Sequence, residues 1–118
     1  MPYDENLAER VREVLRRRRG IREKKMFGGL AFLVNGNMAC GILGRDLMVR
    51  VGPDAYEASL KKAGVRPMDF TGRPLRGMVY VGARGYRRAT SLEAWVEQGL
   101  SFARSLPPKK VNPRPDDA

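Results

Sequence analysis

The side chains that most often carry chemistry are few in this sequence. It contains no histidine and one cysteine, Cys40. The lack of histidine removes the commonest general base, the commonest metal ligand and the Ser-His and Cys-His nucleophile pairs. Cys40 lies in an apolar run that predicts a buried position, where a thiol is inert. The carboxylates are scattered, and each fits a structural role at a turn, at a helix start or beside a basic residue. We therefore expect no enzyme, no cofactor and no metal site.

Two glycine-containing stretches raise the question of phosphate binding. The first, KKMFGG at residues 24–29, lacks the spacing of a P-loop and precedes an apolar run, whereas a phosphate cradle opens a helix. The favoured interpretation is structural: Gly28 and Gly29 turn the chain into a strand, while Met26 and Phe27 pack at the edge of the sheet. The second, within residues 73–88, gives a weaker signal for a closed polar pocket that binds a small ligand.

Positive charge is the strongest bulk feature of the chain. Its 118 residues carry a formal net charge of +10, which favours anionic partners. Residues 16–25 contribute seven basic residues and one acid, hence +6. Two interpretations stay open for this segment. It is either the solvated end of a helix, whose C-terminus favours cations, or an anion and nucleic-acid surface made of Arg16, Arg17, Arg18, Arg19, Arg22, Lys24 and Lys25.

Other bulk features bear on the cellular setting. No apolar run approaches the roughly 20 residues of a membrane span. The N-terminal residues include acids where a secretion signal has a basic start and an apolar stretch. A single cysteine excludes an internal disulfide. We expect a cytoplasmic protein without a membrane partner.

The positions of apolar residues predict an α+β fold in the order α-β(3)-α-β(2)-α, with helices packed on a mainly antiparallel sheet. One domain is expected at residues 1–108 and a disordered basic, proline-rich tail at 109–118. Asp4 is the predicted N-cap of the first helix, and Thr90 or Ser91 that of the last. The expected helices are 4–19, 52–64 and 90–106, and the expected strands are 28–34, 37–43, 47–51, 68–70 and 77–81.

The strongest turn signal, Asn35-Gly36, fixes the expected strand register. A two-residue loop there pairs Leu33 with Met38 and Ala31 with Cys40. Side chains alternate across a strand, so one apolar face faces the core. The opposite face is also apolar, and we expect either a helix of this chain or a partner protein, a second copy or a regulatory protein, to cover part of it. The predicted partner-face residues are Leu30, Phe32, Leu43 and Met48.

Four motifs now stand in order along the chain: KKMFGGLAFLVNGNMACGIL, DLMVRVGPDAYEASL, RPMDFTGRPLRGMVYV and LEAWVEQGLSFARSLPPKK. Together they resemble the TfoX N-terminal domain family, whose best-known members regulate transcription in natural competence. The resemblance implies the same element order and no catalytic residues. Competence regulators of the family carry a second, helical domain, and this chain looks like the stand-alone form. The resemblance implies a non-enzymatic regulatory or protein-interaction module; the alternative is direct nucleic-acid binding through residues 16–25.

Overall fold

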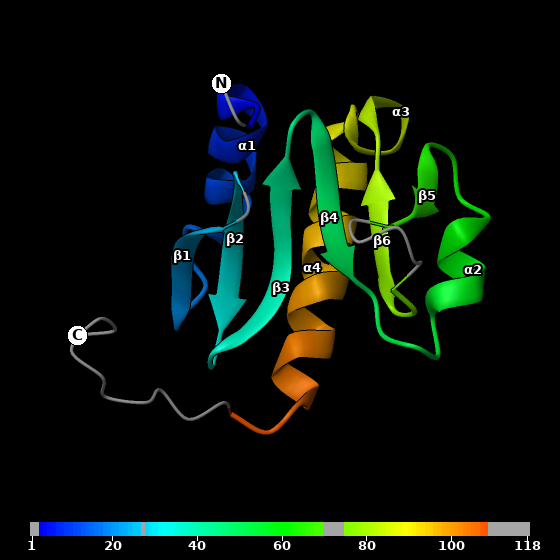
Figure 1. The fold of residues 1–118 in the computed structure, drawn as a ribbon. Helices are drawn as coiled ribbons and strands as arrows, with labels where there is room; N and C mark the ends of the chain where they lie inside the picture. Colours follow the sequence, from blue (N-terminus) through cyan, green and yellow to red (C-terminus); the bar gives the residue numbers. More distant parts are fainter. Residues whose placement is uncertain (1–2, 27, 70–74, 109–118) are drawn as a thin grey trace.

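A six-stranded antiparallel sheet in the order β1-β2-β3-β4-β6-β5 organises the chain. The computed structural model describes residues 3–26, 28–69 and 75–108. The class is α+β, as the sequence predicts (Figure 1). In chain order the elements are α1 (Glu5–Leu15), β1 (Ile21–Met26), β2 (Gly29–Val34), β3 (Asn37–Leu43), β4 (Asp46–Arg50), α2 (Tyr56–Leu60), β5 (Val65–Pro67), β6 (Met78–Val81), α3 (Ala83–Tyr86) and α4 (Ala89–Ser105).

The long helices cover one face of this sheet. Figure 1 shows α4 crossing behind the strands, and α1 contacts α4 on the same side. Both helices contribute buried residues to the main core, which they share with the strands. No helix of the described residues lies over the opposite face in Figure 1, and α2 stands beside β5 at the edge of the sheet. We call this opposite face the open face.

The structure contains one strand more before α2 than the sequence predicted. Helix α1 ends at Leu15, and after the turn at Gly20, whose φ is +76°, residues Ile21–Met26 form β1. The prediction missed β1 because its six residues include four charged ones and show no apolar alternation. A charged strand suits the edge of a sheet, since charge there discourages pairing with other chains.

A β-bulge changes the facing of β2. Leu33 lies opposite Met38 as predicted, but Phe32, not Ala31, lies opposite Cys40. Ala39 is therefore an extra residue on β3 without a partner across the ladder. Ala31 lies opposite Gly41 instead. The predicted facing of β2 was wrong because the bulge shifts the register by one residue, and such a shift exchanges the two faces of a strand.

The helix ends agree with the sequence in part. The Asp4 carboxylate accepts hydrogen bonds from the backbone N–H groups of Asn6 and Leu7, at 2.9 and 3.2 Å, so the predicted N-cap is confirmed. The predicted caps Thr90 and Ser91 are wrong, because α4 already begins at Ala89.

Other element bounds differ from the prediction. Helix α2 is shorter than the expected helix at residues 52–64, and β5 precedes the expected strand at 68–70. Helix α3 occupies a predicted loop. The predicted tail, 109–118, lies outside the described residues.

Gly99 allows α4 to approach the sheet closely. A Cβ atom added at Gly99 would collide with the carbonyl oxygen of Ala39 and would touch Val49. Ala39 is the bulge residue, and both it and Val49 are fully buried. The helix therefore lies directly on the backbone of β3 at the bulge.

We expect Gly99→Ala to lower the free energy of unfolding. Alanine stabilises a helix by about 1 kcal/mol relative to glycine, but overpacking a close contact costs about 1–3 kcal/mol. Since the obstacle is backbone and cannot move aside as a flexible side chain does, we expect a net loss of at least about 1 kcal/mol. Urea denaturation measures the difference. Ser101→Ala, at an exposed position of the same helix, is the control and should change stability by less than about 0.5 kcal/mol. A Gly99→Ala protein as stable as the parent would contradict the close contact.

Candidate functional site

At the centre of the open face, two small residues lie next to larger apolar ones. Ala31, Gly41, Met48 and Tyr80 lie directly opposite one another on β2, β3, β4 and β6. Directly opposite residues of an antiparallel pair share a face. Gly41 has no Cβ, and the terminal methyl groups of Met38 and Met48 fill the space that a Cβ would need. The centre of the face is therefore shallow, apolar and lined by flexible side chains.

A second apolar cluster, separate from the main core, occupies this face. Met48, Met68 and Tyr80 are its buried members, and Met38, Leu43 and Met78 are half-buried against them. We call these six residues the methionine cluster. It holds four of the six methionines in the chain. Methionine side chains are flexible and polarizable, so they adapt to irregular surfaces better than branched side chains do.

Charged groups border the methionine cluster at β5. The Arg66 guanidinium lies 4.8 Å from the ring centroid of Tyr80 and donates hydrogen bonds of 3.2 and 2.5 Å to the Asp46 carboxylate. The hydrogen bond that Arg66 donates to Asp46 raises the pKa of Arg66. Burial, followed by the charges of Asp69 and Asp46, raises the pKa of Tyr80, so its hydroxyl stays neutral at pH 7.

The structure divides the predicted partner-face residues between two faces. Leu43 and Met48 belong to the methionine cluster on the open face. Leu30 and Phe32 are 2% and 1% exposed in the main core, on the side of the helices. The β-bulge at Ala39 is the physical reason, because it rotates these two β2 side chains away from the open face.

Three side chains of the basic segment, residues 16–25, are held in ion pairs. Arg16 pairs with Glu13 at 2.8 Å, and the Arg18 Nε donates to Glu97 of α4 at 2.9 Å. Glu23 accepts two hydrogen bonds from Arg12, at 2.8 and 2.9 Å, which lowers the pKa of Glu23. These pairs join α1, β1 and α4, so part of the segment serves the fold.

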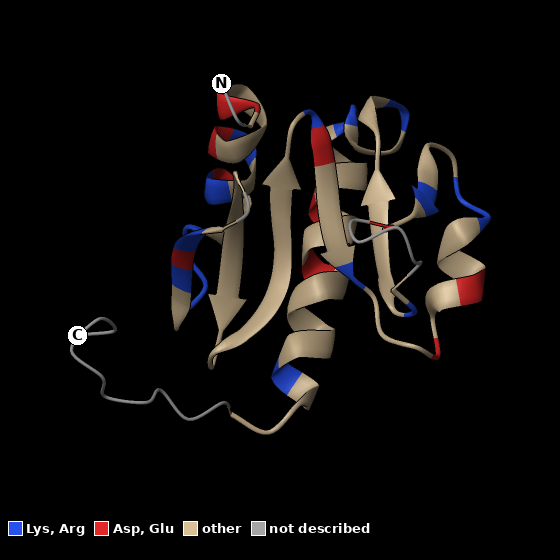
Figure 2. Ribbon diagram, viewed as in Figure 1, with Lys and Arg blue, Asp and Glu red and all other residues tan. Residues whose placement is uncertain are grey.

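Other cations of the segment have no acidic partner within 4 Å among residues 3–26, 28–69 and 75–108. Arg22 and Lys24 lie opposite Leu33 and Ala31, so they share the open face, whereas Lys25 lies opposite Leu30 on the helix side. Figure 2 shows these charges along β1, beside β2 and β3, which carry none. The segment is thus no single helical surface. The exposed cations without a pair are Arg17, Arg19, Arg22, Lys24 and Lys25.

Met26 ends β1, Gly29 begins β2, and Gly28 lies in the connection between them; Phe27 lies outside the described residues. Gly28 has a φ of +78°, a conformation that favours glycine. A Cβ on Gly29 would collide with the carbonyl oxygen of Ile42 on the neighbouring strand. Both glycines therefore have a structural role in a hairpin, in agreement with the interpretation that the sequence favoured.

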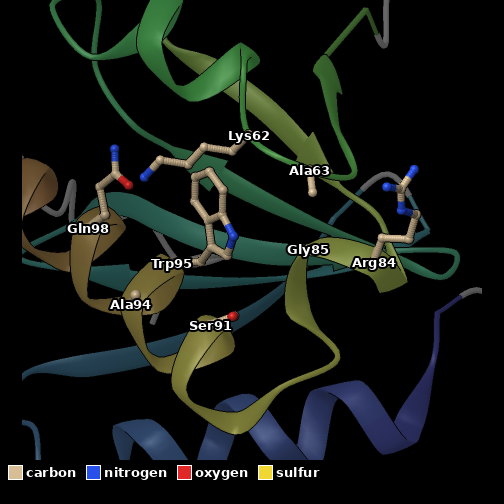
Figure 3. Close-up of a pocket in the computed structure, with 8 residues that line it drawn as sticks. All are labelled: Lys62, Ala63, Arg84, Gly85, Ser91, Ala94, Trp95 and Gln98. Carbon is tan, nitrogen blue, oxygen red and sulfur yellow. The ribbon is translucent and has the colours of Figure 1, made fainter.

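A pocket of about 240 Å³ lies away from the open face, between α3, α4 and the residues that join α2 to β5 (Figure 3). Arg84 and Gly85 come from residues 73–88, the stretch with a weak signal for a pocket. The sequence reasoning missed Lys62 and Trp95, which come from distant parts of the chain and meet only through folding. The lining residues are Lys62, Ala63, Arg84, Gly85, Ser91, Ala94, Trp95 and Gln98.

Cys40 has the environment of a core residue. It is fully buried, and burial raises the pKa of its thiol to about 12. In the described part of the chain, no three His, Cys, Asp or Glu residues are grouped so that they can hold a metal ion. The same residues contain no helix with the length and apolar character needed to span a membrane.

We expect Cys40 to resist alkylation in the folded protein. Iodoacetamide reacts with the thiolate, and a pKa of about 12 leaves the thiol protonated at pH 8. Mass spectrometry should show labelling slower by roughly a hundredfold or more in buffer than in urea, where the thiol regains its ordinary pKa and access. Equal rates in buffer and in urea would show that Cys40 is not buried.

The comparison with protein families adds the identity of the domain. The model of the TfoX N-terminal domain matches residues 13–103, which is most of the chain. No curated protein and no solved structure matches the chain significantly. The chain belongs to the TfoX N-terminal domain family.

Proposed function

We propose that this TfoX N-terminal domain protein is a non-enzymatic interaction module whose open face binds an acidic segment of a partner protein. One observation carries the proposal. The half-buried members of the methionine cluster lie on a sheet face that no described helix covers. The edge strand β1 of the same face carries Arg22 and Lys24, which have no acidic partner among the described residues. An apolar centre with a basic border fits a segment that combines apolar and acidic residues.

The apolar centre supplies the adaptable part of such a surface. Surfaces rich in methionine can repack around different apolar side chains, which is the behaviour of promiscuous binding proteins. Met38, Leu43 and Met78 are only half-buried, so a partner would complete their burial. Each buried CH₂ contributes about 0.8 kcal/mol.

The charge of the chain favours an acidic partner over a second copy. Two copies with a net charge of +10 each repel one another. A two-fold contact through this face would bring the same patch of both copies together, so Arg22 and Lys24 of both copies would add their positive charge to one interface. An acidic partner instead gains attraction and a faster association.

The regulatory part of the proposal rests on the family. Its best-known members act in transcription and natural competence, and we place this protein in the same cytoplasmic setting as a regulator that works through binding. The non-enzymatic part is supported by the lack of histidine and by the buried thiol of Cys40.

A labelled synthetic peptide of alternating leucine and glutamate should bind the protein, as measured by fluorescence anisotropy. The double variant Met38→Gln/Leu43→Gln should weaken binding at least about tenfold, or about 1.4 kcal/mol, through the loss of apolar contact. Both positions are half-buried, so the fold should survive, and circular dichroism checks it. Arg22→Ser/Lys24→Ser should also weaken binding and reduce its dependence on salt.

Two controls make this test specific. Leu106→Gln changes a half-buried leucine at the end of α4 and should leave binding unaltered. A peptide with lysine in place of glutamate should bind poorly. Equal binding of the two peptides would refute the proposal. So would a stable dimer in sedimentation that Met38→Gln/Leu43→Gln dissociates, because a second copy would then be the partner.

Direct binding of nucleic acid is the second candidate function, favoured by the cations of the basic segment that have no acidic partner among the described residues. Arg17→Ser/Arg19→Ser removes two of these charges without breaking an ion pair of the described residues. If each contacts a phosphate, the slope of log K against log salt should fall by about 2. Arg87→Ser/Arg88→Ser removes the same charge elsewhere and should have a smaller effect. Negligible affinity for DNA and RNA at low salt would remove this candidate.

A further inference from the structure

The pocket between α3 and α4 has a lining that suits an anion. Its two charged residues, Lys62 and Arg84, are both cationic. The hydroxyl of Ser91 and the amide of Gln98 add hydrogen-bond donors, and no carboxylate belongs to the lining. Such a set of donors without a competing acid is the chemistry that phosphate and carboxylate oxygens require.

Trp95 gives the pocket a donor with no assigned partner. This residue is only 6% exposed, and within the described part of the chain its indole N–H makes no hydrogen bond. Because no side-chain nitrogen or oxygen of the described residues is both sealed from solvent and without a partner, the indole nitrogen is accessible from the pocket. In Figure 3 the indole nitrogen points toward Gly85, on the side of the pocket that Arg84 borders. An acceptor in the pocket would satisfy this N–H.

Close packing keeps the space beside the indole open. A Cβ added at Gly85 would collide with Val81 and the carbonyl oxygen of Ala63, and would lie 3.8 Å from the indole nitrogen. Only glycine fits at position 85, so no side chain from α3 fills the space beside the indole N–H of Trp95. The start of α4 also favours an anion in the pocket. Ser91 lies in the first turn of this helix, and a helix N-terminus favours negative charge.

The two cations lie at opposite ends of the pocket and can both turn inward. Figure 3 shows Lys62 extended over the indole ring, and its ammonium nitrogen is 4.9 Å from the ring centroid. Arg84 projects from α3 at the other end. Both side chains are long and exposed, so each charged head can turn toward an anion without movement of the backbone.

We propose that this pocket binds a small molecule through a phosphate or carboxylate group, held by Lys62, Arg84 and the indole N–H of Trp95. The volume of about 240 Å³ is below the roughly 300–1,000 Å³ of sites for drug-sized ligands, so the ligand is a small metabolite. The site lies on the helix side of the sheet and does not depend on the interaction proposed for the open face.

Trp95 is the only tryptophan of the chain, so its fluorescence reports on this pocket. We would titrate the full-length protein with inorganic phosphate and, separately, with acetate, at an ionic strength held constant with sodium chloride. A saturable change in fluorescence is expected for at least one of them, and calorimetry measures the same affinity independently. A response to phosphate alone or to acetate alone identifies the class of ligand.

Variants then locate the binding. Lys62→Met and Arg84→Met should each weaken it about tenfold or more, because each removes a charge-assisted hydrogen bond to the anion. Lys61→Met removes a neighbouring exposed charge that does not line the pocket and should leave the affinity unchanged. Met38→Gln/Leu43→Gln should also leave it unchanged, which separates this site from the open face.

Three outcomes would overturn the proposal. They are the absence of saturable binding by both methods, an equal response to chloride, and an equal loss in Lys61→Met and Lys62→Met. The last two outcomes would show that anions are attracted by the general positive charge of the surface and that no defined binding site exists at Trp95.

Discussion

The close contact of α4 with β3 at Gly99 and Ala39 is the constraint on which the rest of the structure depends. The helix lies so near the strand that no Cβ fits between Gly99 and the carbonyl oxygen of Ala39. At the same point the strand bulges and supplies Ala39 without a partner across the ladder. Helix and bulge thus fit each other, and together they determine which side chains of the sheet point into the main core.

The two faces of the sheet differ as a consequence. The bulge brings Phe32 and Leu30 into register with Cys40 and Ile42 on the helix side, where branched and aromatic residues fill the core. The open face keeps Ala31 and Gly41, with methionines around them. A well-packed core specifies one arrangement, whereas a face of small and flexible residues can accept several. The β2–β3 register therefore determines both the close packing of the helix side and the adaptable surface of the open face.

Local sequence signals predicted the elements well where one short stretch determines the structure. Asn35 and Gly36 both have positive φ, as the hairpin turn requires. The register beyond the turn was not predictable in this way. Every residue of β3 after Asn37 is apolar or small, so its pattern does not show which face each residue takes. Strand β1 carries too many charges to resemble a strand, and the pocket around Trp95 requires contacts that only the folded chain makes.

The position of α4 at the end of the described chain has a consequence for biosynthesis. Strands β1 to β4 follow one another and pair with their sequence neighbours, so they can associate early through short loops. The helix that covers them follows β6 in the chain, so the ribosome completes these strands before the helix. A ribosome extends the chain by about 5–20 residues each second, so the apolar side of the nascent sheet waits for seconds without its cover. During that interval the charges on β1 protect an edge that would otherwise recruit another chain.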